Sequence, residues 1–302
     1  MIDVSCNLCG RDDWQVLYPA TLPPQDQPDV RAFRCTSAGY GFHAQIVQCN
    51  HCGYVYANPV WEDEELLALY GAVEDETYVE ERLGRRLTFD KHLKDFERHT
   101  GPGNGRKMLD VGAYIGVFVE VAREAGWDAW GVEPSSWAVQ EAQRHNLPII
   151  QGTLDSPEVA AMRFDAVTMW DVIEHVYDPQ GELRKAFGVL NPGGYIAVHT
   201  MDIESRMAKL MGERWPWLMA MHIHYFSQRT LAAMLEKVGF EVVWSGAQGR
   251  YIRLNYLSSR IGGFNPTAGR MADRVFRGLG VAEKPVAIKL GDLFTVYARK
   301  PS

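Results

Sequence analysis

The sequence lacks a surplus of positive charge. Its 302 residues include 31 Lys and Arg against 38 Asp and Glu, a formal net charge of −7. Nucleic-acid binding relies on clustered Lys and Arg that displace counterions from phosphates, so this balance argues against a nucleic-acid partner. The one compact basic group, Arg82, Arg85 and Arg86, lies among acidic residues and predicts a solvated helix face. The alternative for this group is attraction of an anionic substrate.

Long apolar runs are also missing. No stretch reaches the roughly 18 apolar residues of a membrane-spanning helix. The first residues show no basic segment followed by an apolar one. We therefore expect no membrane span and a cytoplasmic location. The length exceeds that of a typical single domain, so a catalytic domain with a smaller accessory domain is expected.

Cysteine is scarce, and four of the five cysteines form two C-x-x-C pairs. The pairs are Cys6 with Cys9 and Cys49 with Cys52, and a glycine follows each pair. Four thiolates in this pattern are typical of a structural Zn²⁺ site, which has no open coordination position and performs no chemistry. Disulfides in an oxidising compartment and a redox couple are the alternatives. Cys35 is left over.

The glycine turn at 109–118, L-D-V-G-A-Y-I-G-V-F, lacks the pattern of a dinucleotide site. Tyr114 stands where the G-x-G-x-x-G pattern has a second glycine next to the pyrophosphate. Gly112 permits a sharp turn out of the strand, and Gly116 permits a close approach where the next helix starts. Glu133 ends the following strand, and its carboxylate can accept two hydrogen bonds from a ribose diol. The pattern predicts a nucleoside ligand and disfavours a dinucleotide.

Strand and helix signals alternate after this turn. Apolar runs predict strands at 107–111, 128–132, 148–150, 164–169 and 194–199, with helices near 116–125, 135–145, 156–162 and 179–190. The alternation predicts an α/β fold with a mostly parallel sheet. A helix at 228–238 and strands at 240–245 and 292–299 follow. Helices at 64–70 and 76–99 precede the sheet, and residues 247–291 are expected to form a helical insertion on the substrate side.

In their order, these motifs resemble the class I S-adenosylmethionine-dependent methyltransferases. The resemblance rests on the D-x-G-x-x-x-G-x-F turn at 110–118, V-E-P-S at 132–135, F-D-A-V at 164–167, D-V-I-E-H-V at 171–176 and L-N-P-G-G at 190–194. It implies a Rossmann-like sheet of seven strands with the last strand antiparallel, and S-adenosyl-L-methionine as the cofactor. The strictest departure is Tyr114, where the family has a glycine.

The resemblance also implies which residues contact the cofactor. The glycine turn and the strand ends beside it are expected to hold the methionine and ribose, and the segment after the third strand the adenine. The implied contacts are Asp110, Gly112, Ala113, Tyr114, Gly116, Phe118, Glu133, Pro134, Thr153, Leu154, Trp170 and Asp171. Tyr70 and Tyr78 are expected either to cover the cofactor or to pack against the sheet.

Two segments offer a histidine as the catalytic base. Asp171, Glu174 and His175 are spaced so that one helical turn clusters them, and a histidine suits removal of a proton from a methyl acceptor. His222 is the rival base, because the resembled family has a similar histidine facing its substrate. Tyr225 can stabilise an enolate, so both oxygen and carbon acceptors stay open. In ubiquinone-pathway relatives the Glu-His pair helps to hold a divalent metal. The resemblance therefore implies a second role for Glu174 and His175, and Asp171 would complete the set of ligands.

Three parts are expected along the chain: a zinc ribbon at 1–60, a helical linker or lid at 61–105 and the cofactor-binding domain at 106–302. The ribbon resembles the module attached to many bacterial methyltransferases of sugars and secondary metabolites. The sequence therefore predicts methyl transfer to oxygen or carbon of a small molecule, by in-line displacement with a histidine base. A nucleotide-linked sugar or a natural-product intermediate is the expected acceptor. The alternatives are an RNA methyltransferase and a protein that binds S-adenosylmethionine without turnover.

Overall fold

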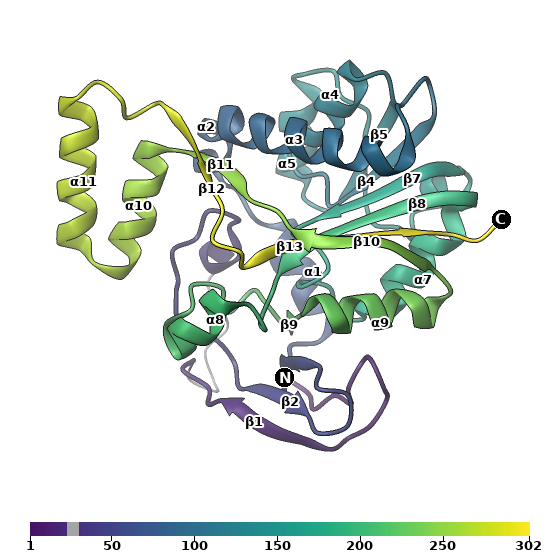
Figure 1. Cartoon of the computed structure of the whole chain (residues 1–302), viewed down its shortest axis with the longest axis horizontal. Coiled ribbons are helices and arrows are strands. Elements are labelled where there is room, and N and C mark those ends of the chain that lie inside the picture. Colours follow the sequence, from purple (N-terminus) through teal and green to yellow (C-terminus); the bar gives the residue numbers. More distant parts are fainter. Residues whose placement is uncertain (23–29) are drawn as a thin grey trace.

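A seven-stranded sheet forms the centre of the computed structural model, which describes residues 1–22 and 30–302 (Figure 1). The strand order is β10-β13-β8-β7-β4-β5-β6. The bounds are β4 Lys107–Val111, β5 Asp128–Glu133, β6 Ile149–Gln151, β7 Phe164–Trp170, β8 Leu190–Met201, β10 Glu241–Ala247 and β13 Leu293–Arg299. β13 is antiparallel to both of its neighbours, whereas the pairs from β8 across to β6 are parallel. The predicted Rossmann-like sheet with an antiparallel last strand is confirmed.

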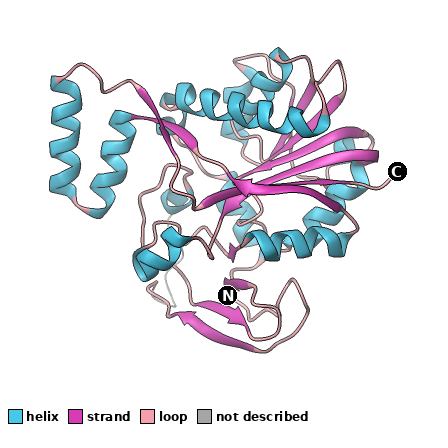
Figure 2. Cartoon of the chain, viewed as in Figure 1, coloured by secondary structure: helices cyan, strands magenta, loops and turns pink. Residues whose placement is uncertain are grey.

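Helices cover both faces of this sheet. One face packs against α3 (Arg82–Thr100), α4 (Val117–Glu124) and α5 (Ser136–Gln143). The other face packs against α6 (Pro157–Ala160), α7 (Pro179–Val189) and α9 (Gln228–Val238). Helices therefore lie on both sides of the strands (Figure 2). A parallel sheet covered on both faces needs strands that are apolar throughout. β7 meets this need, because every one of its residues except Asp165 is buried.

Capping residues set where two of these helices begin and end. The Ser227 side chain accepts a hydrogen bond from the Thr230 N–H at the start of α9, and Gly239 ends the helix in a left-handed conformation with φ 113°. Asp178 caps α7 in the same way, with Pro179 in the first turn. The helices predicted at 228–238 and 179–190 therefore agree with the structure to within about one residue.

The single helix predicted at 76–99 is wrong. The segment forms a short α2 (Glu76–Glu80) and then α3, with a break at Glu81. Glu81 is buried, and its carboxylate accepts a hydrogen bond of 2.8 Å from Arg253 Nε. A residue far along the chain therefore holds the break. The preceding helix α1 (Asp63–Gly71) agrees with the helix predicted at 64–70.

The N-terminal part forms a second sheet that includes one strand from a distant part of the sequence. Its order is β1 (Trp14–Tyr18), β2 (Ile46–Cys49), β3 (Val55–Ala57) and β9 (His224–Tyr225). β3 pairs with β9 in antiparallel register, Val55 opposite Tyr225 and Tyr56 opposite His224. Because β9 lies between the central sheet and α9 in sequence, the N-terminal part is hydrogen-bonded directly to the segment that carries the second group of predicted catalytic residues.

The insertion after β10 combines strands and helices. β11 (Arg250–Arg253) and β12 (Pro285–Ile288) form a two-stranded ribbon, and α10 (Leu254–Phe264) and α11 (Pro266–Gly278) lie at its end. The two helices project from the body of the molecule (Figure 1). The remaining elements are α8 (Arg206–Met211) and the 3₁₀ turns η1 (Val30–Phe33) and η2 (Gly212–Arg214). None of the helices in the described part of the chain combines the length and apolar character needed to span a bilayer.

Candidate functional site

A cavity of about 550 Å³ opens at the carboxyl ends of β4, β5 and β7. This is the edge at which open α/β sheets bind their ligands. α1, α3 and the ribbon β11–β12 contribute to its walls. Eight of the twelve predicted cofactor contacts line it: Gly112, Tyr114, Glu133, Pro134, Thr153, Leu154, Trp170 and Asp171.

The glycine turn after β4 has no room for larger side chains at Gly112. The backbone there has φ +66°, and a Cβ atom would lie 2.7 Å from a methyl carbon of Val172. Tyr114 also has a positive φ, 48°, which is uncommon for a residue other than glycine. The backbone of Tyr114 thus has a conformation that glycine favours. Its ring packs edge-on against Tyr78, with the two ring centroids 4.6 Å apart. Both tyrosines line the cavity.

Glu133 joins the two loops at this edge. Its Oε2 accepts the Tyr114 N–H at 2.9 Å and its Oε1 accepts the Ser135 N–H at 2.8 Å. Each carboxylate oxygen has a second lone pair, so both can still accept from a ribose diol. Burial raises the pKa of Glu133 to about 7, against the lowering effect of the two backbone hydrogen bonds. The turn and this carboxylate therefore fit the nucleoside part of S-adenosylmethionine.

The other four predicted contacts do not line the cavity and lie in or next to the glycine turn after β4. Asp110 is buried and accepts a 2.7 Å hydrogen bond from the Thr168 hydroxyl, and burial raises its pKa to about 8. Gly116 begins α4, where a Cβ would meet Leu147 at 2.7 Å. Phe118 packs against the ring of Trp170 at 5.1 Å. These residues and Ala113 are not among the residues that line the cavity.

His175 and His222 lie side by side in the same cavity. Their ring centroids are 4.9 Å apart. Nδ1 of His222 lies 2.7 Å from the Trp217 carbonyl oxygen, and Nδ1 of His175 lies 2.9 Å from that of Met221. Because a carbonyl only accepts, we assign the proton to Nδ1 in both rings, which leaves Nε2 as the acceptor.

Burial keeps both imidazoles neutral. It lowers the pKa of His175 to about 4 and, together with the neighbouring His175, that of His222 to about 3. The Tyr70 hydroxyl lies 2.7 Å from Nδ1 of His175 and donates to the Met221 carbonyl at 2.9 Å. Tyr70 therefore lines the cavity and orients one of the two candidate bases.

Glu174 holds the His222 segment through its backbone. Its carbonyl oxygen accepts the N–H groups of Ile223 and His224 at 3.0 and 3.1 Å. Its side chain is buried, Oε2 has no hydrogen-bond partner in the described part of the chain, and burial raises its pKa well above the ordinary value. Tyr225 is not brought to the cavity. Its ring is fully buried and packs in a cluster with Ile46.

One group of three side chains here could hold a metal ion. Ligand atoms of Glu174, His175 and His222 all lie within 4.8 Å of one another. His222 takes the place that the spacing of the D-V-I-E-H-V segment suggested for Asp171. Asp171 lies 3.7 Å from Nε2 of His199 instead, and its backbone has a positive φ of 56°.

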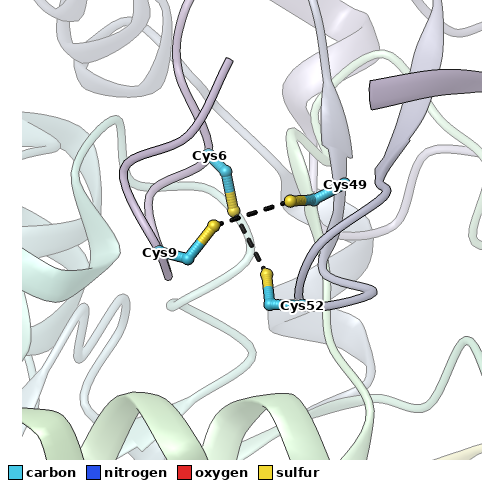
Figure 3. A group of neighbouring side chains, drawn as sticks. All are labelled: Cys6, Cys9, Cys49 and Cys52. Carbon is cyan, nitrogen blue, oxygen red and sulfur yellow. Dashed lines mark hydrogen bonds between the residues drawn. The ribbon is translucent and has the colours of Figure 1, made fainter. Parts of the chain in front are cut away.

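The four paired cysteines converge on one point (Figure 3). The sulfurs of Cys6 and Cys52 are 3.5 Å apart and those of Cys9 and Cys49 are 3.6 Å apart. All four are free thiols, and all their sulfur atoms lie within 4.8 Å of one another. A tetrahedron with Zn–S bonds of about 2.3 Å needs sulfurs roughly 3.8 Å apart. The cluster therefore fits one Zn²⁺ ion, as the two C-x-x-C pairs predict.

Charged residues in the cavity walls were not among the predicted site residues. Arg82 and Arg86 pair with acidic side chains of α4, as expected for a solvated helix face. That expectation is wrong for Arg85, which lines the cavity with its guanidinium 4.4 Å from the Tyr78 ring centroid. Tyr78 lies on α2 and Arg85 on α3, on either side of the break at Glu81, so helical spacing does not explain this contact. Arg250 of β11 also lines the cavity, and no sequence signal marked it.

The sheet order and the cavity at its carboxyl edge are those of a class I S-adenosylmethionine-dependent methyltransferase. Residues 80–245 match the sequence model of a family described as "Methyltransferase domain". This is more than half of the chain, and the chain belongs to that family.

Similar proteins agree with this assignment. The chain is 32% identical over 118 residues to a ubiquinone biosynthesis O-methyltransferase of Azorhizobium caulinodans, covering 37% of this chain and 47% of that protein. It is 27% identical over 171 residues to a protein of the same name from Bordetella avium. This match covers 52% of this chain and 70% of that protein. The chain spans about half the length of the curated relatives that it matches at about 30% identity. A crystal structure of a SAM-dependent methyltransferase from Archaeoglobus fulgidus shares the fold, with a TM-score of 0.50 and 16% identity. The match covers 75% of this chain and 100% of that chain.

The affinity for S-adenosylmethionine should depend on the charge of Glu133. The ionised carboxylate accepts ribose hydrogen bonds best, and its pKa of about 7 lies above the ordinary 4.5, so affinity should be full above pH 7 and fall as the pH drops through that value. Replacing Glu133 by Gln should weaken binding roughly 10- to 100-fold and remove this pH dependence. Isothermal titration calorimetry from pH 6 to 8.5 measures both effects. Exposed Glu158→Gln is the matched control, and an unchanged dissociation constant in Glu133→Gln would contradict the assignment.

Metal analysis should find one zinc ion per chain, held by the four cysteines. Replacing Cys49 by Ser should abolish stoichiometric zinc and lower the unfolding midpoint by about 10 °C or more, because a structural metal contributes several kcal/mol to folding. Cys35→Ser is the control, since Cys35 lies outside the cluster, and it should keep the zinc. Full zinc occupancy in Cys49→Ser would show that the cluster is not the binding site.

Proposed function

We propose that this chain transfers the methyl group of S-adenosylmethionine to a hydroxyl oxygen of a small molecule. The proposal is carried by one observation: Glu133, which fits the ribose, and the pair His175 and His222 line the same cavity. The cavity therefore has room for the methyl donor at Glu133 and for a methyl acceptor next to a histidine base. The names of the curated relatives, which are O-methyltransferases, support an oxygen acceptor.

The chain's contribution to the reaction is alignment and proton removal. S-adenosylmethionine, when bound, supplies an electrophilic methyl group on a sulfonium with a good leaving group. The acceptor oxygen must face that methyl carbon in line with the breaking C–S bond. Its proton is taken by the Nε2 of a neutral imidazole, because Nδ1 is engaged with a carbonyl oxygen in both histidines. The methyl carbon then gains a C–O bond as the C–S bond breaks, and the electron pair of that bond stays on sulfur.

We assign the base to His175 and a positioning role to His222. His175 is the more accessible ring of the two, since it is half-buried and His222 is buried. Tyr70 and the Met221 carbonyl fix its Nδ1 from two directions. His222 packs beside it and carries the more strongly lowered pKa, which makes it the poorer proton acceptor. Either ring is neutral at physiological pH, so its Nε2 carries no proton.

The position of Tyr225 removes the argument for a carbon acceptor. A tyrosine that stabilises an enolate must point at the substrate, and this ring lies in the core behind the cavity. The cavity walls near the histidines are apolar and aromatic, with Phe33, Leu66 and Met219. Such walls suit an acceptor with an apolar part, so a natural-product intermediate or a nucleotide-linked sugar with a hydrophobic face remains our proposal.

The two alternatives are less well supported. The net charge of −7 disfavours RNA. A protein that binds the cofactor without turnover would have no need of two adjacent neutral histidines at the donor cavity. Tyr114, the strictest departure from the family's motif, has a backbone with the positive φ that a glycine would take there.

Replacing His175 by Gln should lower the rate of methyl transfer about 10²- to 10⁴-fold, the usual contribution of a general base. Replacing His222 by Gln should lower it roughly tenfold, and exposed His145→Gln should have no effect. The measurement uses methyl-labelled S-adenosylmethionine with a panel of phenols and nucleotide-linked sugars and detects the labelled product by mass spectrometry. Cofactor affinity should stay within about threefold in all three variants, because neither ring contacts Glu133 or its loop. Saturable cofactor binding without transfer to any panel member would favour the non-catalytic alternative.

A further inference from the structure

Arg250 lies in the cavity wall on an aromatic support. It begins β11, and its guanidinium carbon is 4.7 Å from the centroid of the Trp217 ring. The Trp217 ring is itself fixed, because its Nε1 donates a 2.9 Å hydrogen bond to Asp292. A guanidinium stacked on a fixed indole is restricted in orientation, with its N–H groups directed outward from the ring edge.

This guanidinium is not used by the fold. No hydrogen bond or ion pair joins the side chain of Arg250 to another residue within 1–22 and 30–302. Its neighbour on the same ribbon, Arg253, shows the usual alternative, with ion pairs to both Glu81 and Glu283. Asp171, Asp292 and Arg85 are near enough to affect its pKa, but none of them forms an ion pair with it, and a buried charge without a direct partner is costly in free energy. Burial lowers the pKa of Arg250, and an anion supplied by a ligand would relieve this cost.

Arg250 lies on the histidine side of the cavity. The Trp217 ring beneath it is 5.9 Å from His222, which is 4.9 Å from His175. Arg260, a further cavity arginine, donates to the backbone carbonyls of Ser37 and Thr36. Arg85, which has no ion pair among the described residues, stacks on Tyr78, whose ring touches Tyr114 of the cofactor turn. Arg250 and Arg85 are therefore placed differently, one against the acceptor side and one against the donor side.

Two carboxylates, Asp171 and Asp292, act on the pKa of Arg250, and neither forms an ion pair with it among the described residues. Asp292 is engaged by Trp217. Asp171 lies in the cavity, where burial raises its pKa but His199, Arg250 and Arg85 together lower it, so it stays ionised. Asp171 repels a second anion, which favours an anionic ligand on the Trp217 side of Arg250.

We propose that Arg250 binds an oxyanion group of the methyl acceptor, a carboxylate or a phosphate, and so holds the acceptor hydroxyl toward the histidine pair. The inference rests on the proposed function and adds the substrate class to it. Carboxylate and phosphate share the pair of oxygens that a guanidinium binds in a fork. An acceptor with an anionic group at one end and a hydroxyl at the other would be oriented in a single way by this residue.

The test uses the full-length, zinc-containing protein saturated with S-adenosylhomocysteine. Calorimetric titration with pyrophosphate and, separately, with glutarate should show saturable binding of at least one anion, and the stronger of the two identifies phosphate or carboxylate. Replacing Arg250 by Gln should weaken that binding roughly 10- to 100-fold, and Arg250→Lys should retain part of it. Arg144→Gln is the matched control, because Arg144 is exposed and lies outside the cavity wall.

The outcomes separate this inference from the proposed function. If S-adenosylmethionine binds but the anions bind Arg250→Gln as well as the wild type, or bind neither protein, the inference is overturned and the methyltransferase proposal stands. If Arg250→Gln loses cofactor affinity instead, the guanidinium belongs to the donor site and the inference is again overturned. If the wild type fails to bind S-adenosylmethionine at all, the proposed function itself fails.

Discussion

The carboxylate of Glu133 is the contact on which the donor side of the cavity depends. Each of its oxygens accepts one backbone N–H, from Tyr114 on one loop and from Ser135 on the next. These two hydrogen bonds fix the turn after β4 against the end of β5 without any ligand. The site is therefore preorganised, and binding need not order the loop. The free lone pairs that remain on this carboxylate would favour a diol, which donates hydrogen bonds, over a phosphate, which would be repelled.

The acceptor side depends on a different set of backbone contacts. The Glu174 carbonyl fixes residues 223 and 224, and β3 pairs with the same segment from the opposite side. His222 is thus placed by the loop after β7 and by the N-terminal sheet together. Arg229 on α9 strengthens this junction by donating to the Cys52 carbonyl at 2.9 Å. The four-cysteine cluster, although remote from the chemistry, lies next to the strand that sets the position of a histidine in the cavity.

Much of this architecture could be predicted because the signals are local. The apolar strands, the caps at Ser227 and Gly239 and the turn at Gly112 each follow from residues close in sequence. The break at Glu81 could not, because its partner Arg253 comes from the insertion. His222 lines the cavity whereas His224 and Tyr225 do not, and no local pattern could show this. This arrangement is set by pairing with β3, a contact between segments far apart in the chain.

The same long-range origin explains the residues that sequence reasoning missed. Arg250 reaches the cavity because β11 folds back over α3, where Gly84 allows the Tyr251 carbonyl to approach closely. Neither residue carries a motif. The acidic neighbours of Arg85 in sequence suggested solvent, and the break at Glu81, which sets α3 apart from α2, was not predicted. The glycine turn at Gly112, by contrast, could be predicted because its steric requirements involve residues close together in sequence.

The shared strand β9 has a consequence for how the chain could be divided. A fragment beginning after residue 60 would lose β1, β2 and β3 and leave the backbone groups of His224 and Tyr225 without their hydrogen-bond partners, and it would expose the apolar side chains that β2 and β3 now cover. Such a fragment would tend to self-associate, and His222 would lose the N-terminal sheet that holds its segment in place. The amino-terminal module is therefore better regarded as a structural wall of the catalytic unit than as a detachable appendage.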